Sequence, residues 1–498
     1  MTDILLGKGD QQIYLRSKYA NRHGLVAGAT GTGKTVSLLV AAEGLSRIGV
    51  PVFMADVKGD VAGLSMPGVA KPDIEKRAHD VGLAGFAPEA TPVVFWDFYG
   101  KAGHPIRTTI SEVGPSLLAR MLELNDVQAG VLDITFKLAD EQGLLLLDLD
   151  DLRSILTLIA EKRDEVSQHY GLVSAQSVSA IQRALLRLDN DGGKQFFGEP
   201  ALELADLLRT DLSGRGVVSI LSADRLVLQP RLYSTFLLWL LSELFEQLPE
   251  VGDLDKPKLA FVFDEAHLLF DNASPALLQR IEQVVRLIRS KGVGIYFCSQ
   301  FPDDVPGEIL GQLGNRVQHA LRAFTPRDQK AVRTAAETFV ANPKLDVATA
   351  ISQLRVGEAL VSTLQENGVP MPVERALMAP PRCRMGSVTA DERAATLARS
   401  PVGAKYDRAV NRESAYEILT RRRTEAAATP TPAPQAAAPA AASAAKQGGD
   451  MLHDWLWGTG RRQGMVESMA KQAARTVGSQ LGRQILRGVL GGIAGGRR

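Results

Sequence analysis

A glycine-rich segment between an apolar run and a helical pattern constrains the fold of this 498-residue chain most strongly. The segment reads Gly28-Ala-Thr-Gly-Thr-Gly-Lys-Thr35 and fits the spacing G-x-x-x-x-G-K-[ST]. Its glycines let successive backbone N–H groups surround a phosphate, and the next helix adds the positive end of its dipole. The sequence therefore predicts a strand, a phosphate-binding loop and a helix running to about Ile48.

The loop composition also predicts the roles of its residues. Lys34 is expected to reach the β- and γ-phosphates, and the Thr35 hydroxyl is expected to ligate Mg²⁺. The predicted cofactors are ATP and Mg²⁺. The residues expected to bind the nucleotide are Gly28, Ala29, Thr30, Gly31, Thr32, Gly33, Lys34 and Thr35.

Short apolar runs alternate with helical patterns along the rest of the chain. Nearly continuous apolar strands separated by helices predict an α/β fold with a mostly parallel sheet covered on both faces. The runs lie at 24–28, 50–56, 93–97, 216–221, 259–264, 294–300 and 317–322.

A second motif, Leu259 to His267, predicts a buried strand that carries two carboxylates at its end. Ligands bind open α/β sheets at the carboxyl ends of the strands, which is also where the phosphate loop is expected. Asp264 is predicted to hold Mg²⁺ and Glu265 to polarise the attacking water. Neighbouring strand residues point to opposite sides, so the two carboxylates can have separate roles. The alternative is a surface turn after a core strand, and His267 either positions a ligand or caps the next helix.

The strand from Gly294 ends at Gln300, whose amide can both donate and accept hydrogen bonds. This places a candidate γ-phosphate sensor after the two stronger motifs. Cys298, in the same strand, is predicted to be a small buried residue rather than a reactive thiol.

The formal net charge of +1 arises from segments of opposite charge. Residues 123–165 carry 4 basic and 11 acidic side chains, whereas 375–423 carry 11 basic and 5 acidic, and 450–498 carry 8 basic and 3 acidic. Nucleic-acid contact is therefore expected only from local patches. The two cysteines fit a reducing compartment, and neither a secretory signal nor a long uninterrupted apolar segment is recognised, so we expect a cytoplasmic protein.

Composition and periodicity also predict the domain organisation. The segment 424–449, rich in Ala and Pro, is expected to be a flexible linker. The basic amphipathic tail after it is expected to self-associate or bind another protein partner, to contact a membrane surface or nucleic acid, or to be disordered. The predicted parts are 1–102, the N-terminal part of an ATPase core with the phosphate loop; 103–214, a mostly helical insertion; 215–423, the C-terminal part of the core; 424–449, the linker; and 450–498, the tail.

Together, Gly28–Thr35, Asp56-Val-Lys-Gly-Asp60, Asp264-Glu265 and Ser299-Gln300 resemble the HerA/FtsK division of P-loop ATPases. The chain is most similar to a bacterial HerA-like group long listed as a domain of unknown function. Three further segments are typical of that group: Lys18–Gly24, Phe95–Gly100 and Glu246–Asp255.

The resemblance implies a RecA-like core that forms a ring, usually a hexamer, with ATP between neighbours and double-stranded DNA as the polymer. It also implies that Arg22, just upstream of the loop, contributes to a neighbour's nucleotide site. A family arginine after the sensor glutamine is replaced here by Phe301. The candidate substitutes are Arg316, Arg322 and Arg327.

Two functional hypotheses follow. The first is a ring-forming, Mg²⁺-dependent ATPase that moves or remodels DNA. The second, motivated by Phe301, is a nucleotide-switched assembly scaffold that binds ATP without translocating DNA.

Overall fold

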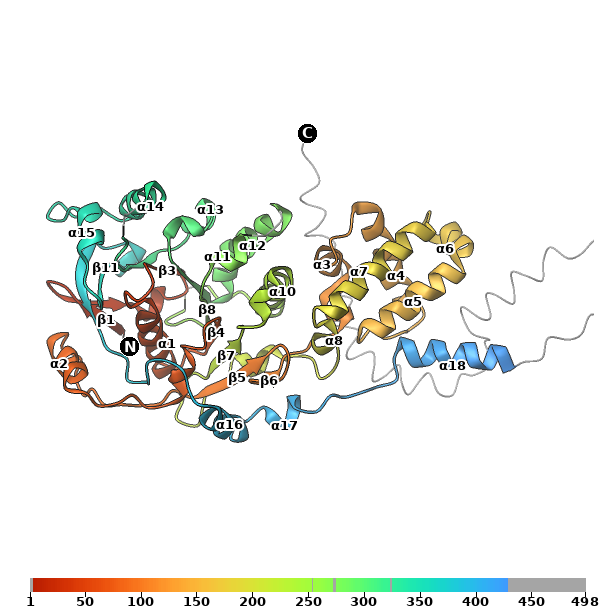
Figure 1. Cartoon of the computed structure of the whole chain (residues 1–498), viewed down its shortest axis with the longest axis horizontal. Helices are drawn as coiled ribbons and strands as arrows, with labels where there is room; N and C mark the ends of the chain where they lie inside the picture. The colour runs from red at the N-terminus through yellow and green to blue at the C-terminus, as the bar shows by residue number, and fades with distance from the viewer. Residues whose placement is uncertain (1–2, 253, 272–274, 323–324, 429–498) are drawn as a thin grey trace, which may run out of the picture. The chain divides into compact units, whose positions relative to one another are not determined.

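The computed structural model describes residues 3–252, 254–271, 275–322 and 325–428, as shown in Figure 1. It divides into two compact units. One contains Met1–Phe136 and Leu146–Tyr416, and the other contains Lys137–Leu145 and Glu417–Arg498. The predicted tail and most of the predicted linker lie outside the described residues.

In the described residues, twelve strands form one sheet with the order β2-β1-β12-β11-β10-β3-β9-β8-β4-β7-β5-β6. The strands from β10 to β6 pair in parallel, and the strands from β2 to β10 pair antiparallel. Their bounds are β1 Ile4–Lys8, β2 Gln12–Leu15, β3 Gly24–Ala27, β4 Val52–Asp56, β5 Val93–Asp97, β6 His104–Pro105, β7 Val218–Ser222, β8 Leu259–Phe263, β9 Val293–Ser299, β10 Asn315–Gln318, β11 Glu358–Ser362 and β12 Glu374–Met378.

The central strands are buried on both faces, which explains their lack of polar alternation. Every residue of β3, β4, β8 and β9 is buried. Hydrophobic burial on both sides favours a parallel sheet covered by helices. The predicted α/β class with a mostly parallel sheet is confirmed.

Helix α1, Lys34–Arg47, follows β3 after the phosphate loop and contacts β1, β3 and β4 (Figure 1). Its buried apolar residues Leu38, Leu39 and Leu45 join one core cluster with Val52 of β4 and Val262 of β8. The phosphate loop is therefore held between a buried strand and a helix anchored in the core.

Between β6 and β7 the described chain has only helices. They are α3 Ile110–Met121, α4 Asp126–Glu141, α5 Leu149–Glu161, α6 Arg163–Tyr170, α7 Ala175–Asn190, α8 Gly193–Phe196 and α9 Leu204–Leu207. Capping boxes at Thr109 and Asp148 begin α3 and α5, because each side chain accepts a backbone N–H that the first turn leaves unpaired.

The remaining helices are α2, between β4 and β5, and those that follow β7. They are α2 Pro72–Asp80, α10 Pro230–Gln247, α11 His267–Phe270, α12 Pro275–Ile288, α13 Gly307–Leu310, α14 Pro326–Glu337, α15 Val347–Gln353, α16 Ala390–Ala398, α17 Gly403–Tyr406 and α18 Ala415–Ala428. Of the helices in the described ranges, none combines the length and apolarity needed to cross a bilayer.

Helix α18 corrects one predicted boundary. It extends to Ala428 and so covers the first residues of the segment expected to be a linker from Thr424 onward. Alanine-rich sequence favours helix when it continues an existing one, because no new nucleus has to form.

Candidate nucleotide-binding site

The phosphate loop adopts a backbone that depends on its glycines. Gly28, Gly31 and Gly33 have φ values of 149°, 77° and 117°. A Cβ on Gly28 would lie 2.5 Å from the Cβ of His319, whereas one on Gly31 would meet nothing within 4 Å. The first glycine thus permits close packing, and all three permit left-handed backbone.

The segment after β10 packs against the phosphate loop and the helix that follows it. The N–H of Ala29 donates to the carbonyl of Ala320 at 2.9 Å. His319 bonds through Nε2 to Ser37 Oγ at 2.9 Å and through Nδ1 to the Glu358 carbonyl at 3.1 Å. Burial lowers the pKa of His319 to about 4, so it supports the loop as a neutral ring. The sequence analysis missed this residue, which lies far from the motif in the chain.

Lys34 is buried and folded back onto its own loop. Its Nζ donates to the carbonyls of Gly28 at 2.6 Å and Ala29 at 3.3 Å. These carbonyls hold the ammonium beside the glycines that are predicted to surround a phosphate. A bound phosphate would offer the same ammonium stronger, charged acceptors.

Thr35 points toward a carboxylate that the sequence analysis did not single out. Its hydroxyl donates to Oδ2 of Asp60 at 2.9 Å. The other oxygen of Asp60, Oδ1, is buried without a hydrogen-bond partner. A buried carboxylate oxygen without a donor fits a cation, and Mg²⁺ prefers oxygen ligands.

No group of three or more His, Cys, Asp or Glu in the described ranges is arranged to hold a metal by itself. Nucleotide-bound Mg²⁺ typically uses one or two protein oxygens together with phosphates and water. Thr35 and Asp60 therefore fit such an ion.

Two further carboxylates, Asp56 and Asp264, lie close enough to Asp60 for their charges to interact. Burial and the charge of Asp60 raise the pKa of Asp56 to about 7. Burial, Glu265 and Asp60 raise the pKa of Asp264 to about 6. Crowded negative charge of this kind is relieved when a cation binds.

Asp264 and Glu265 lie beyond the end of β8 rather than on it, so the argument from alternating strand residues does not apply. Glu265 has φ 49°, a left-handed conformation that a non-glycine residue rarely adopts. Its N–H donates to Oδ1 of Asp264 at 3.0 Å, and the N–H of Ala266 donates to the Cys298 carbonyl at 2.7 Å. These bonds hold the turn and separate the two carboxylates.

The Glu265 carboxylate is buried between two basic side chains. Lys58, from the loop after β4, donates to Oε1, and Nδ1 of His267 lies 3.3 Å from Oε2. His267 is the first residue of α11, so it both begins that helix and faces Glu265. The sequence analysis named Lys58 only as part of the segment Asp56–Asp60, and it did not predict the pairing with Glu265.

Gln300 lies directly after β9, which pairs with β3, and its side chain is half-buried. Phe301 packs partly buried against an apolar cluster that includes Leu321 and Val332. Its N–H donates to Oδ2 of Asp304, which also accepts from Ser299 Oγ. The position expected to carry an arginine is therefore an apolar packing position in this chain.

The candidate arginines lie in different settings. Arg22 precedes β3, so it lies at the opposite sheet edge from its own phosphate loop, with its guanidinium over Tyr19 at 5.2 Å. Arg316 donates to the carbonyls of Leu310, Leu313 and Thr338. It is thus engaged in structural bonds. Arg322 is exposed after β10, and the Arg327 side chain lies outside the described residues.

Arg393 of α16 is a basic residue that the sequence analysis did not single out at this edge. It donates to the Ala102 carbonyl at 3.0 Å and to Ser222 Oγ at 3.1 Å. Its guanidinium lies 4.2 Å from the centroid of the Phe95 ring. Ser222 pairs with Asp56 in the sheet, so Arg393 brings positive charge beside the crowded carboxylates.

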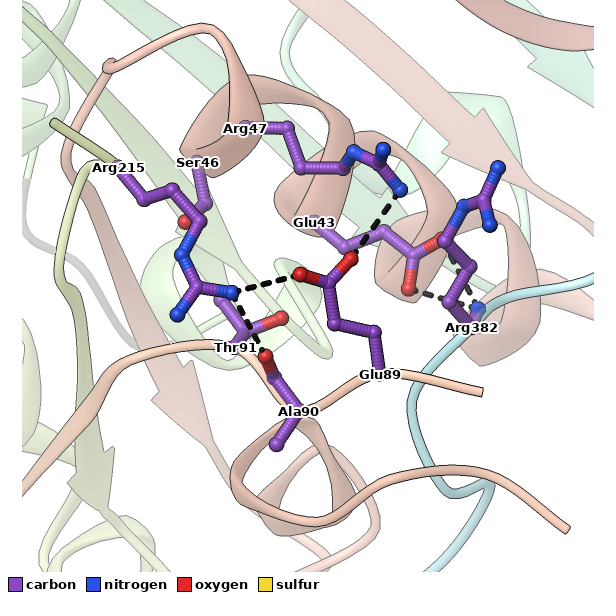
Figure 2. Close-up of a pocket in the computed structure, with 8 residues that line it drawn as sticks. All are labelled: Glu43, Ser46, Arg47, Glu89, Ala90, Thr91, Arg215 and Arg382. Carbon is purple, nitrogen blue, oxygen red and sulfur yellow. Dashed lines mark hydrogen bonds and ion pairs between the residues drawn. The ribbon is translucent and has the colours of Figure 1, made fainter. Parts of the chain in front are cut away.

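Two pockets lie apart from the phosphate loop. Figure 2 shows a small polar pocket where the last turns of α1, with Glu43 and Arg47, meet Glu89, Arg215 and Arg382. A cavity of about 470 Å³ lies beyond β5, lined among others by Tyr99, Arg107, Lys194 and Asp407. Neither is lined by the phosphate loop.

A family model described as Helicase HerA-like C-terminal matches residues 2–498. The chain belongs to this family. The predicted resemblance to HerA-like P-loop ATPases is thereby confirmed.

Sequence relatives agree with this membership. The DNA double-strand break repair helicase HerA of Sulfolobus acidocaldarius is 21% identical over 369 residues, which is 72% of this chain and 66% of that protein. Two proteins of Methanocaldococcus jannaschii named probable helicases are each 31% identical, over 110 and 120 residues. The chain spans about a fifth of their length, 20% and 21%.

The chain also has partial similarity to solved structures, among them a plasmid coupling protein and VirB4. The plasmid coupling protein TrwB in complex with ADP and Mg²⁺ has a TM-score of 0.49 and 15% identity, covering 75% of this chain and 88% of that one. VirB4 of Thermoanaerobacter pseudethanolicus has a TM-score of 0.47 and 15% identity, covering 78% and 98%.

Proposed function

We propose that this HerA-like chain is a Mg²⁺-dependent ATPase that works as a ring, a hexamer by family analogy, on double-stranded DNA. The observation that carries the proposal is the convergence of three elements at one sheet edge. The phosphate loop supplies Lys34 and Thr35, the loop after β4 supplies Asp60, and the turn after β8 supplies Glu265.

The residues at this edge have separate roles in the transfer of the γ-phosphoryl group to water. The N–H groups from Gly28 to Thr35 bind the phosphates, and Lys34 moves from the Gly28 carbonyl to the γ-phosphate. Thr35 and Asp60 would hold Mg²⁺, with Asp264 beside them, and the ion would supply positive charge to offset the negative charge that develops on the phosphate oxygens. Glu265 orients the attacking water and accepts its proton. Gln300 senses the γ-phosphate by hydrogen bonding through its amide.

The ring is supported by the position of Arg22. Because this residue precedes β3, at the edge opposite its own loop, we expect any nucleotide contact that it makes to be with another subunit. The name of the relative HerA, a DNA repair helicase, supports duplex DNA as the polymer.

Two substitutions test the assignment. Lys34→Ala removes the buried ammonium and is expected to abolish nucleotide binding, measured with a fluorescent ATP analogue. Glu265→Gln keeps the size of the side chain and is expected to retain nucleotide binding but lose turnover. Undiminished hydrolysis by purified Glu265→Gln protein would contradict the assigned role of Glu265.

A second candidate function is a nucleotide-switched scaffold that assembles on ATP without moving DNA. The apolar packing of Phe301 and the engagement of Arg316 favour it, because neither position offers a free guanidinium. The ATPase rate with and without duplex DNA separates the two functions. Several-fold stimulation at moderate salt supports the motor, and an unchanged rate supports the scaffold.

A further inference from the structure

The contact between Lys58 and Glu265 joins two neighbouring parallel strands at their carboxyl ends. Lys58 lies in the loop after β4 and Glu265 in the turn after β8, and these strands are adjacent in the sheet. The Lys58 side chain is 46% exposed, whereas that of Glu265 is 5% exposed. A half-exposed cation therefore pairs with a buried carboxylate.

The ion pair engages the carboxylate of Glu265, the group on which the proposed hydrolysis depends. A general base must accept a proton from water at one of its carboxylate oxygens. Oε1 already accepts from the Lys58 ammonium. Oε2 lies 3.3 Å from His267 Nδ1 and is buried without a hydrogen-bond partner, so neither oxygen is open to an attacking water in this arrangement.

Lys58 and Glu265 are side chains of opposite charge, and the Lys58 Nζ contacts Oε1 of Glu265. The contact is therefore an ion pair.

We propose that Lys58 is a positioning residue that holds Glu265 in a resting, hydrolysis-incompetent arrangement, and that turnover requires this ion pair to open. The inference rests on the proposed ATPase function and adds a built-in restraint to the same site. Because Lys58 is half-exposed, its ammonium can leave Glu265 without disturbing the buried core, whereas Glu265 is fixed by its turn.

The first test compares turnover in the full chain without DNA. Lys58→Met keeps the length of the apolar stem but removes the charge. It is expected to raise kcat at least about threefold with the ATP dissociation constant changed less than twofold. Lys58→Arg, which retains an ion pair, is expected to restore the slow rate, and Lys76→Met, an exposed lysine on α2, serves as the matched control.

A rate for Lys58→Met equal to or below wild type would overturn the restraint while leaving the ATPase assignment intact. If neither wild type nor Lys58→Met hydrolyses ATP, the ATPase assignment and the restraint are overturned together. The double variant Lys58→Met/Glu265→Gln must be as inactive as Glu265→Gln, because the restraint acts only through Glu265. Residual acceleration in the double variant would contradict it.

A second measurement does not depend on activity. The melting temperatures of wild type, Lys58→Met, Glu265→Gln and the double variant form a thermodynamic cycle in the nucleotide-free protein. The ion pair predicts that the double variant loses less than the sum of the two single losses. Strict additivity would show that the two side chains do not interact and would overturn the proposal.

Discussion

The hydroxyl of Thr35 donates a hydrogen bond to Oδ2 of Asp60 at 2.9 Å, joining the first turn of α1 to the loop after β4. The sequence motifs alone pair this threonine with Asp264, two strands away from β3 in the sheet. The observed bond makes Asp60, whose second oxygen is buried without a hydrogen-bond partner, the carboxylate that directly faces the threonine.

Asp60→Asn should therefore weaken Mg²⁺-dependent nucleotide binding. The amide keeps the shape of the side chain but loses the charge that a divalent ion requires. We expect the Mg²⁺ concentration for half-maximal binding of a fluorescent ATP analogue to rise about 10-fold. Asp73→Asn, an exposed acidic residue on α2, is the control. Identical Mg²⁺ titrations for Asp60→Asn and wild type would contradict the role.

The two loop glycines Gly28 and Gly31 should differ in their tolerance of a side chain. Gly31→Ala meets open space and should cost about 1–2 kcal/mol from left-handed backbone alone. Gly28→Ala must also displace His319, so its loss of unfolding free energy should be larger. Urea unfolding of both variants measures the difference. Equal losses would show that the contact with His319 does not limit the loop.

Much of the local structure could be predicted from the sequence. Continuous apolar runs mark the central strands, and the glycine spacing marks the phosphate loop, because both signals are contiguous in the chain. The bonds from Thr35 to Asp60 and from Lys58 to Glu265 depend on which strands are neighbours, which no local pattern encodes. The end of β8 at Phe263 shows the same limit, because it moves Asp264 and Glu265 into a turn.

Glu43 should make folding stability depend on pH. This buried residue of α1, seen in Figure 2, accepts from the N–H groups of Arg382 at 2.9 Å and Cys383 at 3.2 Å. Burial raises its pKa from 4.5 to about 7, although those N–H bonds oppose the shift. The folded state therefore binds this proton more tightly than the unfolded state, and the stability it contributes is lost as pH rises from about 4.5 to 7.

Glu43→Gln cannot titrate, so the variant should lack this component. Relative to the variant, wild type should lose up to about 3 kcal/mol of unfolding free energy between pH 4.5 and pH 8. Chemical denaturation at several pH values measures the difference, with exposed Glu75→Gln as the matched control. Parallel stability curves for wild type and Glu43→Gln would contradict the shifted pKa.

Arg393 should stabilise the carboxyl edge of the sheet through its charge as well as its packing. Its guanidinium donates to Ala102 and Ser222 and stacks over Phe95. Arg393→Met keeps an apolar stem over the ring but removes both charged hydrogen bonds and leaves Asp56 without its nearby cation. We expect a loss of about 2 kcal/mol in unfolding free energy, measured in urea. Arg399→Met, an exposed arginine at the end of the same helix, should change it by less than about 0.5 kcal/mol. Equal effects of the two substitutions would show that Arg393 contributes only helix propensity.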